Sequence, residues 1–268
     1  MSQSTPQKIK EMPYVDLMAF LEEVNRPPGG KNSIRIVIQN CFITKDSKVL
    51  DIGCNTGYCS FEIAHLTECS VIGIDISPKM IKTAKKLQRE DSLGNMIKFK
   101  VANAMNPPFE DNIFDVVISG GSTAFIADKE KAIKEYKRVL KPWGFIADIN
   151  FYYRRKPPTN LIRRLNALMD TKIEPWGINY WLELYDQCNL ERYFIYTNNI
   201  DPVGHQEIEK YCAEMIKNKN ISKEDRNILQ RKLTNIMELF NENHKYLSYG
   251  VFILRKRPIK EQISLFGA

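Results

Sequence analysis

The stretch "KVLDIGCNTGYCSFEIAH", Lys48–His65, decides the fold of this chain. Residues 48–53 form a short apolar run that ends in a glycine turn, and residues 58–66 have the apolar spacing of a helix. A strand, a glycine turn and a helix in this order are typical of a unit that holds a nucleotide. The position where such loops usually carry a middle glycine is Asn55, so the identity of the ligand has to come from the surrounding residues.

Composition limits the class of protein. The chain has 268 residues, of which 43% are hydrophobic, enough for one large domain or one domain with an insertion. No apolar run reaches about 18 residues, so we expect no membrane span. The first residues lack the apolar core of a signal peptide. The six cysteines are scattered without the spacing of a zinc site, which is typical of reduced thiols. These features predict a cytoplasmic protein without a metal site, and its net charge of +7 is typical of a Lys-rich surface.

The rest of the chain alternates between strand and helix patterns. Strands are predicted at residues 48–53, 70–75, 97–101, 114–119, 145–151, 191–197 and 249–255, with the segment KPWG, residues 141–144, as the turn before the fifth strand. Helices are predicted at residues 14–25, from 32 or 33, at 58–66, after Ser77, from Asp128, and at 160–170, 180–189, 205–217 and 222–243. This order predicts an α/β fold with a Rossmann-like, mostly parallel seven-stranded sheet, helices on both faces and a helical lid insertion.

The alternation also suggests a division into segments. Residues 1–45 form a predicted N-terminal helical cap, and 46–151 a cofactor-binding core. Residues 152–247 supply lid helices and one sheet strand, and 248–268 the final strand and tail. Ligands of such sheets bind at the carboxyl ends of the strands, so the lid is expected there.

The glycine pattern argues against a dinucleotide. That ligand requires G-x-G-x-x-G, whereas Gly53 and Gly57 are four residues apart and no third glycine follows. The phosphate-binding pattern G-x-x-x-x-G-K is absent as well. Instead, the first strand carries Asp51 and the second ends in Asp75, about 20 residues past the turn, where an acid suits the hydroxyls of a ribose.

Together these residues resemble the class I S-adenosylmethionine-dependent methyltransferases, whose first motif reads D-x-G-x-G-x-G. Residues 51–57 match this motif at all but the middle glycine. The family's segment from the third to the fourth strand resembles residues 101–119, "VANAMNPPFEDNIFDVVIS". Its helix, turn and fifth strand resemble residues 135–148, "EYKRVLKPWGFIAD". The likeness spans Lys48–Asn150, with weaker topological agreement to Arg255. It implies S-adenosyl-L-methionine as cofactor, bound by Asp51, Gly53, Cys54, Asn55, Gly57, Asp75, Ile76, Asn103, Ala104 and Ser119.

Two positions depart from the family pattern. The middle glycine serves a backbone with positive φ, a conformation that asparagine tolerates better than other non-glycine residues, so Asn55 is expected to adopt it. Asn103 stands where the family usually has an acid that accepts a hydrogen bond from the adenine amino group. The side-chain carbonyl of Asn103 can accept the same bond without a charge.

The reacting residues are less clearly indicated. Methyl transfer from a sulfonium is an in-line displacement, so positioning of the acceptor supplies much of the rate. His205, in the predicted lid, is the candidate catalytic base, although a helix-start residue facing water is the more ordinary interpretation. Tyr152, Tyr153 and Arg154 follow the fifth strand and are the candidate substrate-binding residues. Residues 149–169 contain no acid, which indicates either an anionic acceptor (a carboxylate, a phosphate or a carrier's phosphopantetheine) or a solvated basic face.

Two other functions stay open. The basic stretch could track the phosphates of RNA, and Asn55 and Asn103 leave room for a subunit that binds the cofactor without turnover. The segment Asn106–Phe109, NPPF, spells a motif of enzymes that methylate base amino groups, but it precedes the fourth strand rather than following it, so a nucleic-acid partner is not expected. The segment RPPGGK, residues 26–31, precedes the sheet, and its position suggests Arg26 near the cofactor's carboxylate. The acceptor and the oligomeric state are not specified.

Overall fold

The computed structural model describes residues 6–21 and 26–258. Its strands are β1 (Lys48–Ile52), β2 (Ser70–Asp75), β3 (Ile97–Val101), β4 (Phe114–Ser119), β5 (Leu140–Tyr153), β6 (Glu191–Asn199) and β7 (Leu247–Arg255). Its α-helices are α1 (Pro6–Glu11), α2 (Tyr14–Leu21), α3 (Gly30–Asn40), α4 (Tyr58–Thr67), α5 (Pro78–Glu90), α6 (Lys129–Val139), α7 (Thr159–Met169), α8 (Ile178–Gln187), α9 (His205–Ile216) and α10 (Lys223–His244). Two short 3₁₀ turns, η1 (Gly94–Met96) and η2 (Ser122–Phe125), complete these elements.

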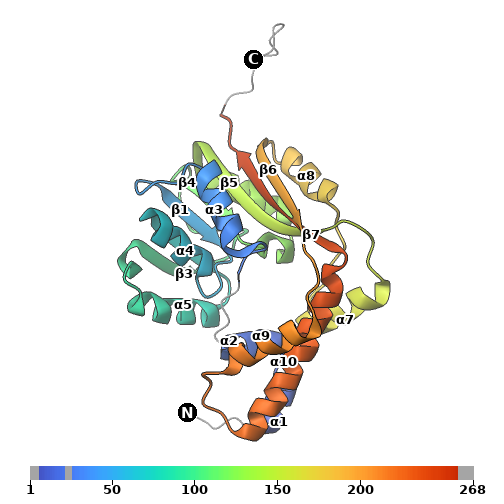
Figure 1. The fold of residues 1–268 in the computed structure, drawn as a ribbon. Coiled ribbons are helices and arrows are strands. Elements are labelled where there is room, and N and C mark those ends of the chain that lie inside the picture. Colours follow the sequence, from blue (N-terminus) through green and yellow to red (C-terminus); the bar gives the residue numbers. More distant parts are fainter. Residues whose placement is uncertain (1–5, 22–25, 259–268) are drawn as a thin grey trace. The chain divides into compact units, whose positions relative to one another are not determined.

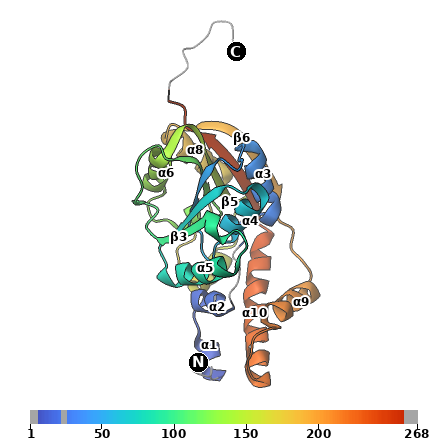
Figure 2. The same cartoon turned by 90° about the vertical axis from the view of Figure 1, so that its left-hand side faces the viewer.

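The strands form one sheet with the order β3-β2-β1-β4-β5-β7-β6 (Figure 1). The pairs β1–β2, β1–β4, β2–β3 and β4–β5 are parallel. Strand β7 runs antiparallel to β5, because Trp143 N–H donates to Lys256 O while Arg154 N–H donates to Tyr246 O. Figures 1 and 2 show α3, α4 and α5 on one face of the sheet and α6 and α8 on the other. The predicted Rossmann-like, mostly parallel seven-stranded sheet with inserted helices is confirmed.

Side-chain caps explain several of the helix starts. Ser77 Oγ accepts from Met80 N–H at the start of α5, and Asp128 Oδ1 accepts from Lys131 N–H at the start of α6. Ser222 Oγ accepts from Asp225 N–H at the start of α10. Each cap satisfies one backbone donor that the helix leaves without a partner, so these three predicted helix starts are confirmed.

Strand β5 begins earlier than predicted. Phe114 pairs with Leu140 and Val116 with Phe145, so KPWG lies inside the strand as a bulge rather than before it as a turn. Trp143 has φ 65°, and its N–H donates to the carbonyl of Lys256, the residue that follows β7. Pro142 and Gly144 locally favour a turn. Pairing with a segment more than 100 residues away in the sequence nevertheless keeps these residues in β5.

The chain divides into two compact units. We call residues 1–25, 151–180 and 197–249 the helical unit, and residues 26–150, 181–196 and 250–268 the sheet unit. The predicted division into four segments is a separate proposal and stays a prediction. None of the helices in the described part of the chain is long and apolar enough to cross a membrane.

The helical unit has an apolar core of its own. Side chains from α1, α2, α9 and α10 build it, among them Leu17, Ile208, Leu229 and Leu233. Figure 2 shows α9 lying against α10. Helix α1 was not expected from the sequence, and the predicted helix 14–25 is observed over Tyr14–Leu21, with residues 22–25 outside the described part.

Candidate functional site

The candidate cofactor residues of the sheet unit gather at the carboxyl ends of its parallel strands. Asp51 in β1 pairs with Gly73 of β2, and the loop that follows β1 reaches the end of β2, where Cys54 N–H donates to Ile74 O over 2.9 Å. Because parallel strands end at a common edge, this bond brings the glycine loop beside Asp75. The sequence prediction that these residues share one site is therefore consistent with their placement.

Asp75 is held by the loop and by the helix that follows it. Its Oδ2 accepts from Asn55 N–H over 3.0 Å, and its Oδ1 accepts from Ser77 N–H over 2.8 Å. Each carboxylate oxygen has a second lone pair that can accept from a hydroxyl group. The next residue, Ile76, is 70% exposed, so an apolar side chain stands in solvent beside the carboxylate.

The loop backbone has the conformation that the sequence suggested. Asn55 has φ 51°, which confirms the prediction of a left-handed residue at the middle position. Its own Oδ1 accepts from Thr56 N–H over 2.8 Å, a local bond that a glycine could not make. Gly53 has φ 62°, and a Cβ there would lie 2.3 Å from Ser122 Cβ, so only glycine fits this position.

Asp51 is the buried acid of the site, with 1% of its surface exposed. Burial raises its pKa to about 7, although the hydrogen bond from the Ser60 hydroxyl, 2.7 Å from Oδ2, opposes the rise. Burial also raises the pKa of the Cys54 thiol, which keeps the thiol neutral. Cys54 therefore contributes its backbone and volume to the loop rather than a reactive thiolate.

Ser119, at the end of β4, belongs to a buried polar network that the sequence did not reveal. The Thr123 hydroxyl lies 2.8 Å from Ser119 Oγ and 2.8 Å from Asp148 Oδ1. The Tyr185 hydroxyl donates to Asp148 Oδ2 over 2.9 Å, and Ser122 Oγ donates to Ile52 O over 2.7 Å. Asp148 is fully buried, and burial raises its pKa to about 6. The network connects α8 with the strand end that carries the cofactor loop.

Asn103 and Ala104 lie just beyond β3. Asn103 is exposed, and its Oδ1 accepts from Met105 N–H over 2.9 Å. One lone pair of this oxygen is left for a ligand donor, so the role foreseen for the side-chain carbonyl is compatible with its local bond. Ala104, which is half-buried, offers only its backbone as a polar partner.

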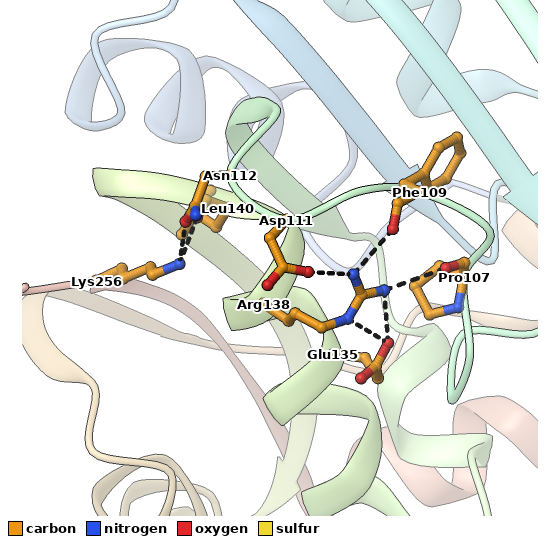
Figure 3. Close-up of polar contacts among 8 residues, drawn as sticks. All are labelled: Pro107, Phe109, Asp111, Asn112, Glu135, Arg138, Leu140 and Lys256. Atoms are coloured by element: carbon orange, nitrogen blue, oxygen red, sulfur yellow. Dashed lines mark hydrogen bonds and ion pairs between the residues drawn. The ribbon is translucent and has the colours of Figure 1, made fainter.

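The neighbouring NPPF segment has a structural role. Arg138 of α6 donates to Phe109 O over 2.8 Å, to Pro107 O over 3.2 Å and to Asp111 Oδ1 over 2.7 Å (Figure 3). Phe109 packs edge-on against Phe114, with ring centroids 5.1 Å apart. The segment is thus a clamped turn before β4.

The candidate substrate residues lie in the helical unit. Tyr153 OH donates to Asn243 Oδ1 over 3.2 Å, and Arg154 Nη2 donates to Lys245 O over 3.0 Å. Arg155 Nη2 reaches the same carbonyl over 2.9 Å, so both guanidinium groups keep further N–H donors for an anion. Tyr152 is half-buried. Their role in substrate binding stays a prediction.

His205 also lies in the helical unit, at the start of α9. Its Nδ1 is 2.5 Å from Glu238 Oε1 and its Nε2 is 3.5 Å from Glu209 Oε1. These carboxylates, Glu238 first, raise the pKa of His205, which favours the protonated ring. A protonated imidazole cannot accept a proton, so the ion pairs do not support the candidate base, and that role stays a prediction.

Comparison with known proteins agrees with this geometry. A family model described as a methyltransferase domain matches residues 43–241. The chain is 39% identical over 135 residues to the tocopherol O-methyltransferase of Arabidopsis thaliana, covering 50% of this chain and 36% of that protein. It is 31% identical over 130 residues to the ubiquinone/menaquinone biosynthesis C-methyltransferase UbiE of Shewanella baltica, covering 48% of this chain and 51% of that protein.

A solved structure extends the likeness over most of the chain. The crystal structure of MccD protein superposes with a TM-score of 0.77 and 29% sequence identity, covering 87% of this chain and 100% of that one. The two named curated relatives are matched over about half of their length or less, so their names describe proteins that this chain resembles in part.

Proposed function

Because the chain belongs to the class I S-adenosylmethionine-dependent methyltransferase family, we propose that it transfers a methyl group to a small or carrier-bound anionic acceptor. S-adenosyl-L-methionine, when bound, supplies an electrophilic methyl group on a sulfonium. The protein's task is then to hold the cofactor and to align an acceptor opposite the sulfur. The two tasks rest on different residues.

The observation that supports cofactor binding best is the anchoring of Asp75. Backbone N–H groups of Asn55 and Ser77 fix its two carboxylate oxygens, so the carboxylate is oriented before any ligand arrives. An oriented carboxylate accepts two hydroxyl donors of a ribose at a smaller entropic cost than a mobile one. Asp51, Gly53, Cys54, Asn55 and Gly57 are proposed to surround the methionyl part, and Asn103 to accept from the adenine amino group.

The anionic acceptor is supported by the basic residues after Asn150. Arg154 and Arg155 are exposed and share the Lys245 carbonyl, which limits their motion while leaving most of their N–H donors available. A guanidinium binds carboxylate and phosphate groups through paired hydrogen bonds. An acceptor that is itself a carboxylate needs no base, which would make the ion-paired His205 dispensable.

A methyl-transfer assay tests this function. The protein is incubated with S-adenosyl-L-methionine and, in separate reactions, with carboxylates, phosphate monoesters, their neutral esters and RNA. S-adenosylhomocysteine and methylated product are measured by mass spectrometry. We expect product from one anionic set and little from its neutral counterpart. Transfer to RNA alone would support an RNA methyltransferase, and cofactor binding without transfer to any acceptor would support a non-catalytic subunit.

Variants then test the substrate residues. The double change Arg154→Gln/Arg155→Gln keeps a hydrogen-bond donor at each position and removes the charge. It should raise KM for the anionic acceptor about tenfold or more and leave cofactor affinity unchanged, as expected for the loss of a charged hydrogen bond. The matched control is Arg163→Gln, on the exposed part of α7. Equal effects of the two variants would contradict the assignment.

A further inference from the structure

We infer that Arg26 pairs with the carboxylate of the cofactor's methionyl part and makes the site selective for the carboxylated cofactor. The inference rests on the proposed function, because it assigns a partner to one group of the proposed cofactor. Three features of the molecule support this pairing: the placement of residues 26–30, the surroundings of the Arg26 guanidinium and two buried hydroxyl groups without hydrogen-bond partners in the described part of the chain.

The segment that contains Arg26 is fixed against the end of β4. Pro27 and Pro28 are buried, and a Cβ added to Gly120 would lie 3.3 Å from Pro27 Cβ. The Ser33 hydroxyl donates to Pro28 O over 2.5 Å, and Gly30 N–H donates to Pro27 O over 2.8 Å. The backbone next to Arg26 is therefore seated at the carboxyl edge of the sheet, the same edge that carries the cofactor loop.

The Arg26 guanidinium lies over the first residue of α4. Its Cζ is 5.7 Å from the centroid of the Tyr58 ring, within the range of a cation–π contact. No acid pairs with it among residues 6–21 and 26–258, whereas the neighbouring Lys31 is 3.1 Å from Glu62. Arg26 is exposed, and its five N–H donors remain available to a ligand.

Two hydroxyl groups of the same loop and helix start lack hydrogen-bond partners. Thr56 Oγ1 and Tyr58 OH are buried atoms with no acceptor or donor within reach in the described part of the chain, and Thr56 is only 2% exposed. Buried polar atoms in native proteins nearly always have a partner, so a bound group is expected to supply one. Tyr58 also begins a helix, whose first N–H groups and dipole favour an anion.

The charges of the site favour a cation here. Asp51 and Asp75, the acids of the loop edge, can pair with the ammonium and hydroxyl groups of the cofactor, but its methionyl carboxylate needs a cationic partner from the protein. A guanidinium held by Tyr58 provides that charge and can donate two parallel hydrogen bonds to a carboxylate. Arg26 therefore discriminates by charge between a cofactor that carries a carboxylate and one that does not.

Calorimetric titration with two ligands tests the inference. The first ligand is S-adenosyl-L-methionine, and the second is its decarboxylated form, S-adenosyl-methylthiopropylamine, which differs by the carboxylate alone. The proteins are the intact chain, Arg26→Ala, Arg26→Lys and the control Lys31→Ala. We expect Arg26→Ala to weaken S-adenosyl-L-methionine binding about ten- to a hundredfold and binding of the decarboxylated ligand less than about twofold. The affinity of Arg26→Lys for S-adenosyl-L-methionine should lie between those of the intact chain and Arg26→Ala, because lysine keeps the charge but lacks the paired N–H donors of the guanidinium.

The outcomes separate this inference from the function on which it rests. If Arg26→Ala weakens both ligands equally, or neither, while the intact chain binds S-adenosyl-L-methionine, only the assignment of Arg26 is overturned. If the intact chain binds neither ligand, the proposed cofactor site and the assignment fail together. Thermal unfolding of each variant shows whether it is folded, and Lys31→Ala should bind both ligands as the intact chain does.

Discussion

Asn55 offers a quantitative test of the cofactor loop, because its backbone and its side chain contribute separately. Its φ of 51° costs an ordinary L-residue about 1–2 kcal/mol, of which asparagine is partly relieved. Its Oδ1 makes one hydrogen bond, to Thr56 N–H, worth about 1 kcal/mol. Asn55→Ala loses both advantages, so its free energy of unfolding should fall by about 2 kcal/mol.

The comparison with Asn55→Gly isolates the backbone contribution. Glycine adopts positive φ without cost but loses the hydrogen bond and gains freedom in the unfolded chain, so the net change should stay within about 1 kcal/mol. Urea unfolding of both variants, followed by circular dichroism, measures the two differences. If the loop of Asn55→Ala instead changes its backbone conformation, the N–H of residue 55 loses its hydrogen bond to Asp75. The affinity for the cofactor should then fall by up to about thirtyfold.

Two results would contradict these expected stabilities. Equal stability of Asn55→Ala and the intact chain would mean that the positive φ carries no cost. A glycine variant as unstable as the alanine variant would mean that the hydrogen bond, and not the backbone, explains the asparagine.

Three further predictions concern the residues around this loop. Gly53→Ala should destabilise the fold by about 2–5 kcal/mol, because its Cβ would lie 2.3 Å from Ser122 Cβ and its φ is 62°. Adding Ser122→Gly should recover the part of this loss that comes from the steric contact. If the two changes in the free energy of unfolding simply add in urea titrations, the contact does not exist. Burial raises the pKa of Asp148 from 3.8 to about 6, so the folded protein binds this proton more tightly than the unfolded chain, and the free energy of unfolding should fall by about 3 kcal/mol as pH rises through 4 to 6. Asp148→Asn should remove that part of the pH dependence, and unchanged pH curves in urea titrations would contradict it. Arg138→Ala should speed amide hydrogen exchange at Asp111 and Asn112 and lower the free energy of unfolding by about 2 kcal/mol. Unchanged exchange would show that the hydrogen bonds of Arg138 in Figure 3 do not hold this turn.

Local sequence signals predicted the features that depend on a few neighbouring residues. The starts of α5 and α6 follow from the side chains of Ser77 and Asp128, which accept from N–H groups three residues later, and the strand β2 follows from a short apolar run. The positive φ of Asn55 follows from its place in the motif. In each case the energetic cause lies within a few residues of the position that the sequence displays.

Features that depend on distant partners were missed. The bulge in β5 exists because Trp143 pairs with Lys256, and helix α1 ends where Lys232 Nζ contacts the carbonyls of Ile9 and Met12. The Asp148–Tyr185 hydrogen bond joins residues 37 positions apart. No periodicity or spacing marks such pairs in one sequence, so only the folded arrangement reveals the buried network beside the candidate site.

We propose that the Gly53–Gly57 loop and Asp75 form a working site for S-adenosyl-L-methionine. Calorimetric titration of the intact chain with this cofactor, repeated with Asp75→Ala and with the exposed control Glu90→Ala, tests it most directly. We expect micromolar binding that Asp75→Ala weakens about tenfold or more and Glu90→Ala leaves unchanged. No binding by the intact chain, or equal binding by Asp75→Ala, would contradict it.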